Sequence, residues 1–281
     1  MAKIKITSDS TCDLNAYVQE RNIEILPLQV NLDGQGYLDG VDITPQDIFA
    51  FVEKTGILPK TSAPSVGDYE DFFQKALEGC DYVIHFNISK KSSGSHDFAV
   101  EAAKAFNGKV RVVDSKGLSS GQGLLVLEAA DMRDAGKSVD EIVDRVLVLR
   151  DKINTSFIPD TLDYLHKGGR VSGMVKVMAS MFKIHPLIYM DDGQLVPGAK
   201  YRGKMTRIID QYVQDLKAKY PNYVKKRCFI THSWAEQDVV DAAKAAVAAN
   251  FEFDEVLETK AGSIITSHCG KGTLGVLFLY E

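Results

Sequence analysis

Residues 82–113 read YVIHFNISKKSSGSHDFAVEAAKAFNGKVRVV, and this stretch decides the fold class. Two short apolar runs, residues 82–88 and 110–113, are typical of strands that are buried in a parallel sheet. A helical stretch, residues 98–106, lies between them. Strands that alternate with helices of about ten residues indicate βαβ units. The stretch therefore predicts an α/β domain with a mostly parallel sheet.

The same alternation extends toward the amino terminus and beyond residue 113. Period-two alternation or β-prone composition predicts strands, and apolar spacing of three to four predicts helices. The expected strands are residues 3–7 and 23–30, the second interrupted by Pro27, and the further expected helices are residues 47–54, 69–78 and 121–134.

The pattern changes near residues 150–154. Residues 187–201 contain Asp191-Asp192-Gly193, a hairpin turn signal between β-prone runs. An alanine-rich helix and further strands follow, namely the helix 235–249 and the strands 228–231, 255–259 and 275–280. We therefore expect two domains, an α/β domain over residues 1–153 and an α+β domain over residues 154–281.

Composition excludes several classes of protein. The chain has 281 residues and a formal net charge of −5, and it lacks the basic stripe of a nucleic-acid-binding protein. The first residues lack the apolar core of a signal peptide, and no apolar run approaches the ~18 residues of a membrane span. The cysteines are scattered, without metal-ligand spacing, and free thiols favour a reducing cytoplasm. We expect a cytoplasmic protein without a bound metal.

Three hydroxyl-rich loops, residues 61–65, 92–95 and 119–121, each precede a helix. One interpretation is helix capping, because a serine hydroxyl satisfies amides that have no other partner. The other is a site for an anion, because ligands of open α/β sheets lie beside helix amino termini, which carry partial positive charge. Among the serines, Ser93 is the best candidate for contacting a bound anion, since Gly94 lets a ligand approach the backbone.

Nucleotide binding is disfavoured despite a matching pattern. Residues 270–275 read GKGTLG and match G-x-G-x-x-G, but a dinucleotide fingerprint follows a strand and opens a helix. Here a predicted strand follows. The histidines never recur at i, i+4, and His85 is interpreted as a core histidine.

A serine hydrolase remains an alternative. Ser93, His268 and Asp114 could form a triad, since the order of triad residues along the chain varies between folds. The sequence lacks the glycine that stands two residues before the nucleophile in the strained serine elbow.

Six short motifs follow one another along the chain. They are TSDSTCDL at 7–14, KTSAPS at 60–65, SGS at 93–95, VDSK at 113–116, LHKGGRVS at 165–172 and HCGKG at 268–272. In this order they resemble the motifs of the DegV family of bacterial fatty-acid-binding proteins. The resemblance covers the chain from residue 7 to residue 272.

The resemblance implies a two-domain DegV-like fold with a long-chain fatty acid, such as palmitate, between the domains. It places the carboxylate at Thr61 and Ser93 with His268 close by, and the acyl chain under the second domain. Family members present the lipid to a fatty acid kinase, which phosphorylates the carboxylate with ATP to an acyl phosphate for phospholipid synthesis. Arg170 and Arg202 match basic positions near the ligand opening and are candidates for docking the kinase. The chain itself is then non-catalytic and needs no cofactor, and a transient contact with the membrane surface is left open.

Overall fold

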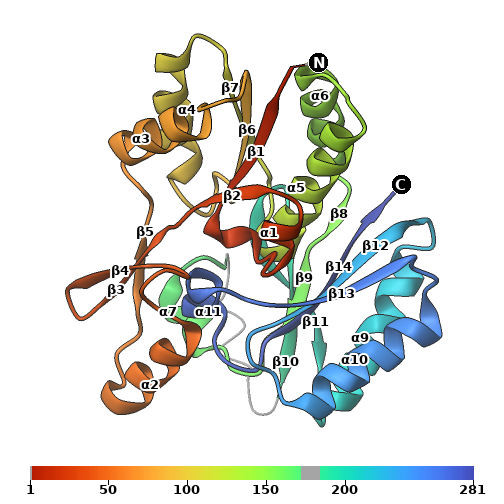
Figure 1. The fold of residues 1–281 in the computed structure, drawn as a ribbon. Helices are drawn as coiled ribbons and strands as arrows, with labels where there is room; N and C mark the ends of the chain where they lie inside the picture. Colours follow the sequence, from red (N-terminus) through yellow and green to blue (C-terminus); the bar gives the residue numbers. More distant parts are fainter. Residues whose placement is uncertain (1, 172–183) are drawn as a thin grey trace.

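The computed structural model describes residues 2–171 and 184–281, so Ser172 of the LHKGGRVS motif lies outside the described residues. A parallel four-stranded sheet forms the centre of the first half, in the order β2-β1-β6-β7 (Figure 1). Its strands are β1 (Ile4–Asp9), β2 (Ile23–Leu26), β6 (Tyr82–Asn87) and β7 (Val110–Asp114). The predicted parallel sheet is confirmed.

Helices cover both faces of this sheet. One face packs against α3 (Val66–Ala76) and α4 (Ser95–Ala103) through a core that includes Tyr69 and Phe73. The other face packs against α5 (Ser119–Asp134) and α6 (Val139–Leu149). The α/β/α layering expected from the sequence is therefore confirmed.

Local sequence fixes where several of these helices begin. Ser65 and Asp68 form a capping box at α3, and Ser138 and Glu141 form one at α6. In each, the serine hydroxyl accepts a backbone N–H while the acidic side chain reaches back to the cap residue.

A larger mixed sheet forms the second half, in the order β11-β10-β9-β14-β12-β13, with β8 also paired to β14. Its strands are β8 (Ile153–Asn154), β9 (Ser156–Ile158), β10 (His185–Asp191), β11 (Gln194–Tyr201), β12 (Tyr223–His232), β13 (Glu255–Lys260) and β14 (Leu274–Tyr280). The helices α9 (Met205–Lys219) and α10 (Gln237–Asn250) cover one face. The predicted α+β character and the hairpin at Asp191–Gly193 are confirmed.

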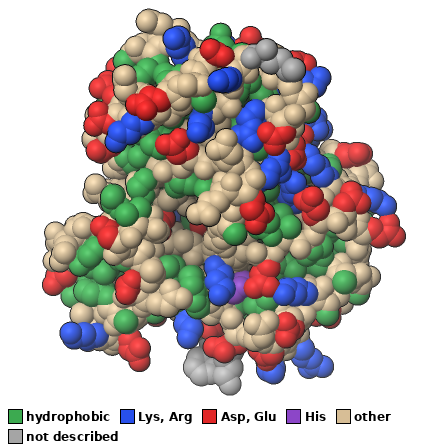
Figure 2. All heavy atoms as spheres, in the orientation of Figure 1, with side chains coloured by type: hydrophobic (Ala, Val, Ile, Leu, Met, Phe, Trp, Pro, Cys, Tyr) green, Lys and Arg blue, Asp and Glu red, His purple; other side chains and the backbone are tan. Residues whose placement is uncertain are grey.

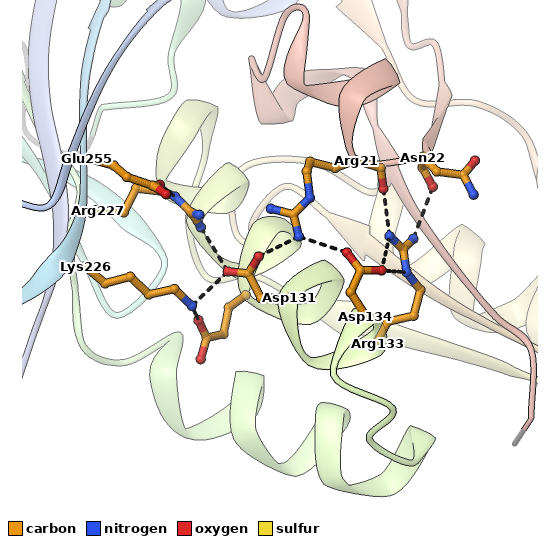
Figure 3. Close-up of polar contacts among 9 residues, drawn as sticks. Arg21, Asn22, Asp131, Arg133, Asp134, Lys226, Arg227 and Glu255 are labelled. Atoms are coloured by element: carbon orange, nitrogen blue, oxygen red, sulfur yellow. Dashed lines mark hydrogen bonds and ion pairs between the residues drawn. The ribbon is translucent and has the colours of Figure 1, made fainter.

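Helix α5 lies between the two sheets and packs on both. Residues from both sheets, including Ile6 and Leu277, share one apolar core with it. A Cβ added to Gly123 would stand 2.8 Å from the carbonyl oxygen of Cys12, so glycine permits this close approach. Near its end, Asp131 of α5 receives ion pairs from both halves of the chain (Figure 3).

A small third sheet, in the order β4-β3-β5, was not anticipated. It contains β3 (Gln29–Leu32), β4 (Gln35–Leu38) and β5 (Lys60–Ser62). The expected interruption of the β-prone run 23–30 at Pro27 is confirmed, because Pro27 separates β2 from β3, and the two strands belong to different sheets. Proline has no N–H to donate to a ladder, and it therefore marks the change of sheet.

The third sheet and α2 (Pro45–Thr55) hold a short helix of the second half, α11 (Ser263–Cys269). Leu28, Val30 and Ile48 bury Ile264 of α11. The remaining short elements are η1 (Ser10–Cys12), α1 (Tyr17–Glu20), η2 (Lys104–Phe106) and α7 (Asp163–Gly168). The division into domains at residues 153 and 154 stays a prediction.

Candidate ligand-binding cavity

A cavity of about 360 Å³ lies where the two larger sheets and α11 meet. Its lining is mostly apolar and comes from both halves of the chain, with Leu28, Ile88 and Leu118 from the first half and Phe157, Leu195 and Leu277 from the second. On the face drawn in Figure 2, hydrophobic side chains border a hollow in the middle of the molecule. Pockets of about 300–1,000 Å³ with few polar groups are typical of small-molecule sites.

Thr61 and His268 form a polar contact on the wall of this cavity. Thr61 lies in β5, whose pairing with β3 fixes its position, and His268 lies in the last turn of α11. The Thr61 Oγ1 is 2.8 Å from the His268 Nε2. Burial, together with the nearby Arg170 cation, lowers the pKa of His268 to about 4. The imidazole is therefore neutral at pH 7.

The other ring nitrogen of His268, Nδ1, is buried and has no hydrogen-bond partner among residues 2–171 and 184–281. A Cβ added to Gly168 would lie 2.7 Å from this atom, so the ring packs directly on the glycine backbone. The glycine of the KGGR motif thus has a steric role next to His268.

Ser93 and Gly94 reach the cavity at the start of α4. The Ser93 Oγ is 2.8 Å from the Ser95 Oγ and also accepts the backbone N–H of Ser95. The loop is folded by Ser89, whose carbonyl accepts the N–H groups of Ser92 and Ser93. The Ser93 hydroxyl therefore accepts the amide of the first residue of α4, although the cap residue is Gly94 and has no side-chain cap, and the same hydroxyl lines the cavity.

The sequence-predicted site residues Thr61, Ser93, Gly94 and His268 all line this one cavity. Their role in holding a carboxylate stays a prediction. Arg170 also lines the cavity, is exposed, and donates from Nη1 to the carbonyl of Gly168 at 2.6 Å. Arg202 is exposed just after β11 and is not one of the residues that line the cavity.

The three residues of the alternative triad have other partners. Ser93 is hydrogen-bonded to Ser95, and His268 to Thr61. The Asp114 carboxylate accepts the backbone N–H groups of Lys90 and Lys116. A nucleophile needs a base within hydrogen-bond reach, and this arrangement does not supply one to Ser93.

Sequence reasoning missed much of the cavity wall. Thr231, which carried no sequence signal, lines the cavity and is hydrogen-bonded to Ser120 and Thr259. Ser119, from the third hydroxyl-rich loop, also lines it and donates to buried Asp13. No local signal marks the apolar lining, because Phe157 and Leu277 lie on different strands of the second sheet. Only the hydroxyl-rich loops carried a readable pattern.

Two properties of the described residues bear on the class of protein. Within residues 2–171 and 184–281, no group of three or more His, Cys, Asp or Glu side chains is placed to hold a metal ion. In the same part of the chain, no helix combines the length and apolar character needed to cross a membrane.

The fold and the cavity define an α/β protein whose two larger sheets enclose a mostly apolar ligand pocket, with hydroxyl groups, a neutral imidazole and Arg170 on its polar wall. The family model described as "Uncharacterised protein, DegV family" matches residues 3–281. The chain belongs to the DegV family.

Individual relatives agree with this assignment. A DegV domain-containing protein of Caldanaerobacter subterraneus is 30% identical, with 99% of each chain covered. A solved DegV family protein from Thermus thermophilus, described as binding fatty acid, has a TM-score of 0.92 and 30% identity, covering 99% of this chain and 100% of that one. A solved stearic-acid-binding protein from Eubacterium ventriosum has a TM-score of 0.85 and 26% identity, covering 99% and 98%.

Proposed function

We propose that this chain binds one long-chain fatty acid, such as palmitate, in the cavity between its two larger sheets. The observation that carries the proposal is the position of Thr61, Ser93 and His268 on the wall of one mostly apolar cavity. The tail would occupy the apolar part, and the carboxylate would accept hydrogen bonds from the Thr61 and Ser93 hydroxyls beside Gly94. His268, bonded to Thr61 through Nε2, would stand close to the carboxylate. The relatives described as fatty-acid-binding support the same ligand class.

The acyl tail and the carboxylate contribute differently to the free energy of binding. Each methylene transferred from water to an apolar site contributes about 0.8 kcal/mol, so a tail of about sixteen carbons contributes on the order of 10 kcal/mol. A hydrogen bond to a charged group contributes about 1.5–3 kcal/mol. The tail would therefore supply most of the affinity, and the hydroxyl groups would orient the carboxylate.

The polar wall also supports a role in presenting the carboxylate. Thr61 and Ser93 are neutral, and the lowered pKa of His268 keeps its imidazole uncharged at pH 7. A carboxylate held by these three side chains stays nucleophilic, because none of them forms a salt bridge with it. In the proposed reaction, a fatty acid kinase transfers the γ-phosphoryl group of ATP to the carboxylate and forms an acyl phosphate and ADP.

In this scheme the chain is the non-catalytic, lipid-binding subunit, and its acyl phosphate feeds phospholipid synthesis. Arg170 lies on the cavity wall and is exposed, so it is suited to contact the kinase. Arg202 is exposed on the loop after β11 and is proposed for the same surface. We place the protein in the cytoplasm, with a transient membrane contact when it takes up or releases lipid.

Lipid extraction of the purified protein, followed by mass spectrometry, tests the ligand. The expected result is close to one fatty acid per chain. Ala63→Trp is the matched control, because Ala63 lines the cavity, is only half-buried, and can accept a larger side chain that fills the entrance. This variant should lose the lipid and melt at the temperature of delipidated wild-type protein, because a ligand bound to the folded state raises the melting temperature. Wild-type protein that neither retains nor binds fatty acid would overturn the proposal.

A further inference from the structure

The amino-terminal motif TSDSTCDL has no part in the proposed ligand contacts, yet one of its carboxylates reaches α11. Asp13 accepts the backbone N–H of Gly262 at 2.8 Å through Oδ1 and the hydroxyl of Ser119 at 2.5 Å through Oδ2. Asp39 accepts the backbone N–H of Ser263 at 2.7 Å. Both aspartates belong to the first half of the chain, whereas the amides belong to the first turn of a helix in the second half.

These two side chains are almost fully buried, with 4% of Asp13 and 6% of Asp39 exposed. Burying a carboxylate is costly unless its oxygens are hydrogen-bonded. The backbone N–H groups at the start of a helix have no partner within the helix, so they are effective donors to such oxygens. The start of α11 is therefore fixed by the first half of the chain, and its position depends on the two aspartates.

Helix α11 has seven residues, Ser263–Cys269, and His268 lies in its last turn. A helix of that length is about 10 Å long and behaves as a rigid unit. A displacement at Ser263 is therefore transmitted to His268, whose Nε2 is 2.8 Å from Thr61 Oγ1. The ends of α11 thus contact the first half at two separate places, the aspartates at one end and Thr61 at the other.

We propose that Asp13 and Asp39 are positioning residues for fatty-acid binding, which hold α11 so that His268 stands beside Thr61 at the carboxylate. This inference rests on the proposed function. It assigns a role to the second aspartate of the amino-terminal motif, although that residue does not line the cavity. The aspartates touch no ligand and act through His268.

A double-mutant cycle separates positioning from a general loss of structure. Asp39→Ala and Asp13→Ala should each weaken binding of a fluorescent fatty acid about tenfold in otherwise wild-type protein. In the His268→Ala background the same substitutions should change affinity less than about twofold, because the side chain they position is gone. Asp39→Asn, which keeps an acceptor oxygen, should restore most of the affinity. An equal loss in both backgrounds would show that the aspartates do not act through His268.

Glu141→Ala is the matched control, because Glu141 is also a carboxylate at a helix amino terminus, in the capping box of α6. It should lower the melting temperature without changing fatty-acid affinity. If Asp39→Ala does not fold, Ser263→Pro tests the same bond from the donor side. Ser263 is the first residue of α11, where proline is tolerated, and Gly262 before it has the extended backbone that proline requires.

Ser263→Pro should also weaken binding only while His268 is present, and an equal effect in both backgrounds would again contradict the inference. The proposed function and the positioning role are overturned by different results. Wild-type protein that binds no fatty acid overturns the proposed function. Tight binding by wild type, with equal losses of affinity in the wild-type and His268→Ala backgrounds, overturns only the positioning role.

Discussion

The hydroxyl of Thr61 is hydrogen-bonded to the imidazole of His268 at 2.8 Å, although 207 positions of sequence separate the two residues. One residue lies in the small sheet of the first half and the other in the last turn of α11. The contact therefore forms only when the two halves of the chain are packed together. A ligand that binds at this contact is held by both halves at once.

Removing the hydroxyl of Thr61 tests this relationship. Thr61→Val keeps the shape of the side chain and should weaken fatty-acid binding by about 1–3 kcal/mol, the range for a buried polar partner left unpaired. Thr61→Ser keeps the hydroxyl and is the control, with affinity close to that of wild type. Ser93→Ala should weaken binding by a similar amount, and the Thr61→Val/Ser93→Ala double variant more. Displacement of a labelled fatty acid measures each value, and wild-type affinity in the double variant would remove both residues from the site.

The partners of Ser93 also predict the outcome of a test for hydrolysis. Its hydroxyl is bonded to Ser95, and His268 is bonded to Thr61, so the described part of the chain places no base to take the serine proton. A fluorophosphonate probe should leave Ser93 unlabelled, and acyl esters should be cleaved no faster than in buffer. Stoichiometric labelling that disappears in Ser93→Ala would instead favour the serine hydrolase.

Sequence patterns predicted correctly those helices and strands whose neighbours along the chain are also their neighbours in space. The run through β6, α4 and β7 is a local βαβ unit, and its strand and helix periods are distinct. The turn at Asp192-Gly193 is likewise a local signal, and both residues have positive φ.

Other features depend on contacts that are distant in sequence. The small sheet was missed because the break at Pro27 does not reveal a change of sheet, and because β3 pairs with β5, which lies beyond α2 in the sequence. The loops with Thr61 and Ser93 were found because hydroxyl groups before helices are visible in the sequence. The hydrogen bonds of Asp13 and Asp39 with the start of α11 could not be predicted from the sequence, since they join segments more than 200 positions apart.

Stability should fall as the pH rises from neutrality. Burial raises the pKa of Asp13 from 3.8 to about 8, so the folded state favours the protonated carboxyl. The resulting stability is fully present below pH 3.8 and is lost as the pH rises toward 8. Burial of His268 acts in the opposite direction, but only as the pH falls from 6.5 toward 4. Between pH 6.5 and 8 the slope is therefore set by the buried carboxyls.

Urea unfolding at pH 6.5 and pH 8 measures this slope, which can reach about 1.4 kcal/mol per pH unit for one group. Asp13→Asn cannot titrate and should show a shallower fall over the same interval. Burial also raises the pKa of Asp39, so Asp39→Asn should be measured over the same interval. Equal slopes in wild type and Asp13→Asn would show that Asp13 does not titrate between these pH values.

The ion pairs of Asp131 should stabilise the packing of the two halves around α5 (Figure 3). Its carboxylate lies 2.5 Å from Arg21 in the first half, and 2.8 Å from Lys226 and 3.3 Å from Arg227 in the second. Burial would raise its pKa, but hydrogen bonds from Lys226 and Arg21 hold the pKa below its ordinary value. Asp131→Asn should lower the free energy of unfolding by about 1–2 kcal/mol, since charged hydrogen bonds are lost at a partly exposed site.

Glu252→Gln is the control for Asp131, because the Lys225–Glu252 pair is exposed, with 60% and 80% of the side chains accessible. Exposed pairs contribute little to stability because water screens them, so this substitution should leave the urea midpoint almost unchanged. The effect of Asp131→Asn should also shrink as salt is added. Equal midpoints for Asp131→Asn and wild type at low salt would show that the cluster does not stabilise the fold.

The last prediction separates holding the lipid from presenting it. Arg170 and Arg202 are exposed, and charges on the rim of an interface act mainly on the rate of encounter. The Arg170→Ala/Arg202→Ala variant should therefore keep its fatty acid and support acyl-phosphate formation poorly when the kinase is limiting. Its defect should be smaller at high salt, where screening already slows the wild-type encounter.

Arg111→Ala/Arg145→Ala is the control for this pair, because both side chains are exposed and neither lines the cavity. It removes the same charge from elsewhere on the surface and should leave turnover unchanged. An equal loss in the control would assign the defect to net charge rather than to a docking surface. Unchanged turnover in Arg170→Ala/Arg202→Ala at low salt would remove these residues from that surface. Loss of the bound lipid would instead place Arg170 among the ligand contacts, as its position on the cavity wall allows.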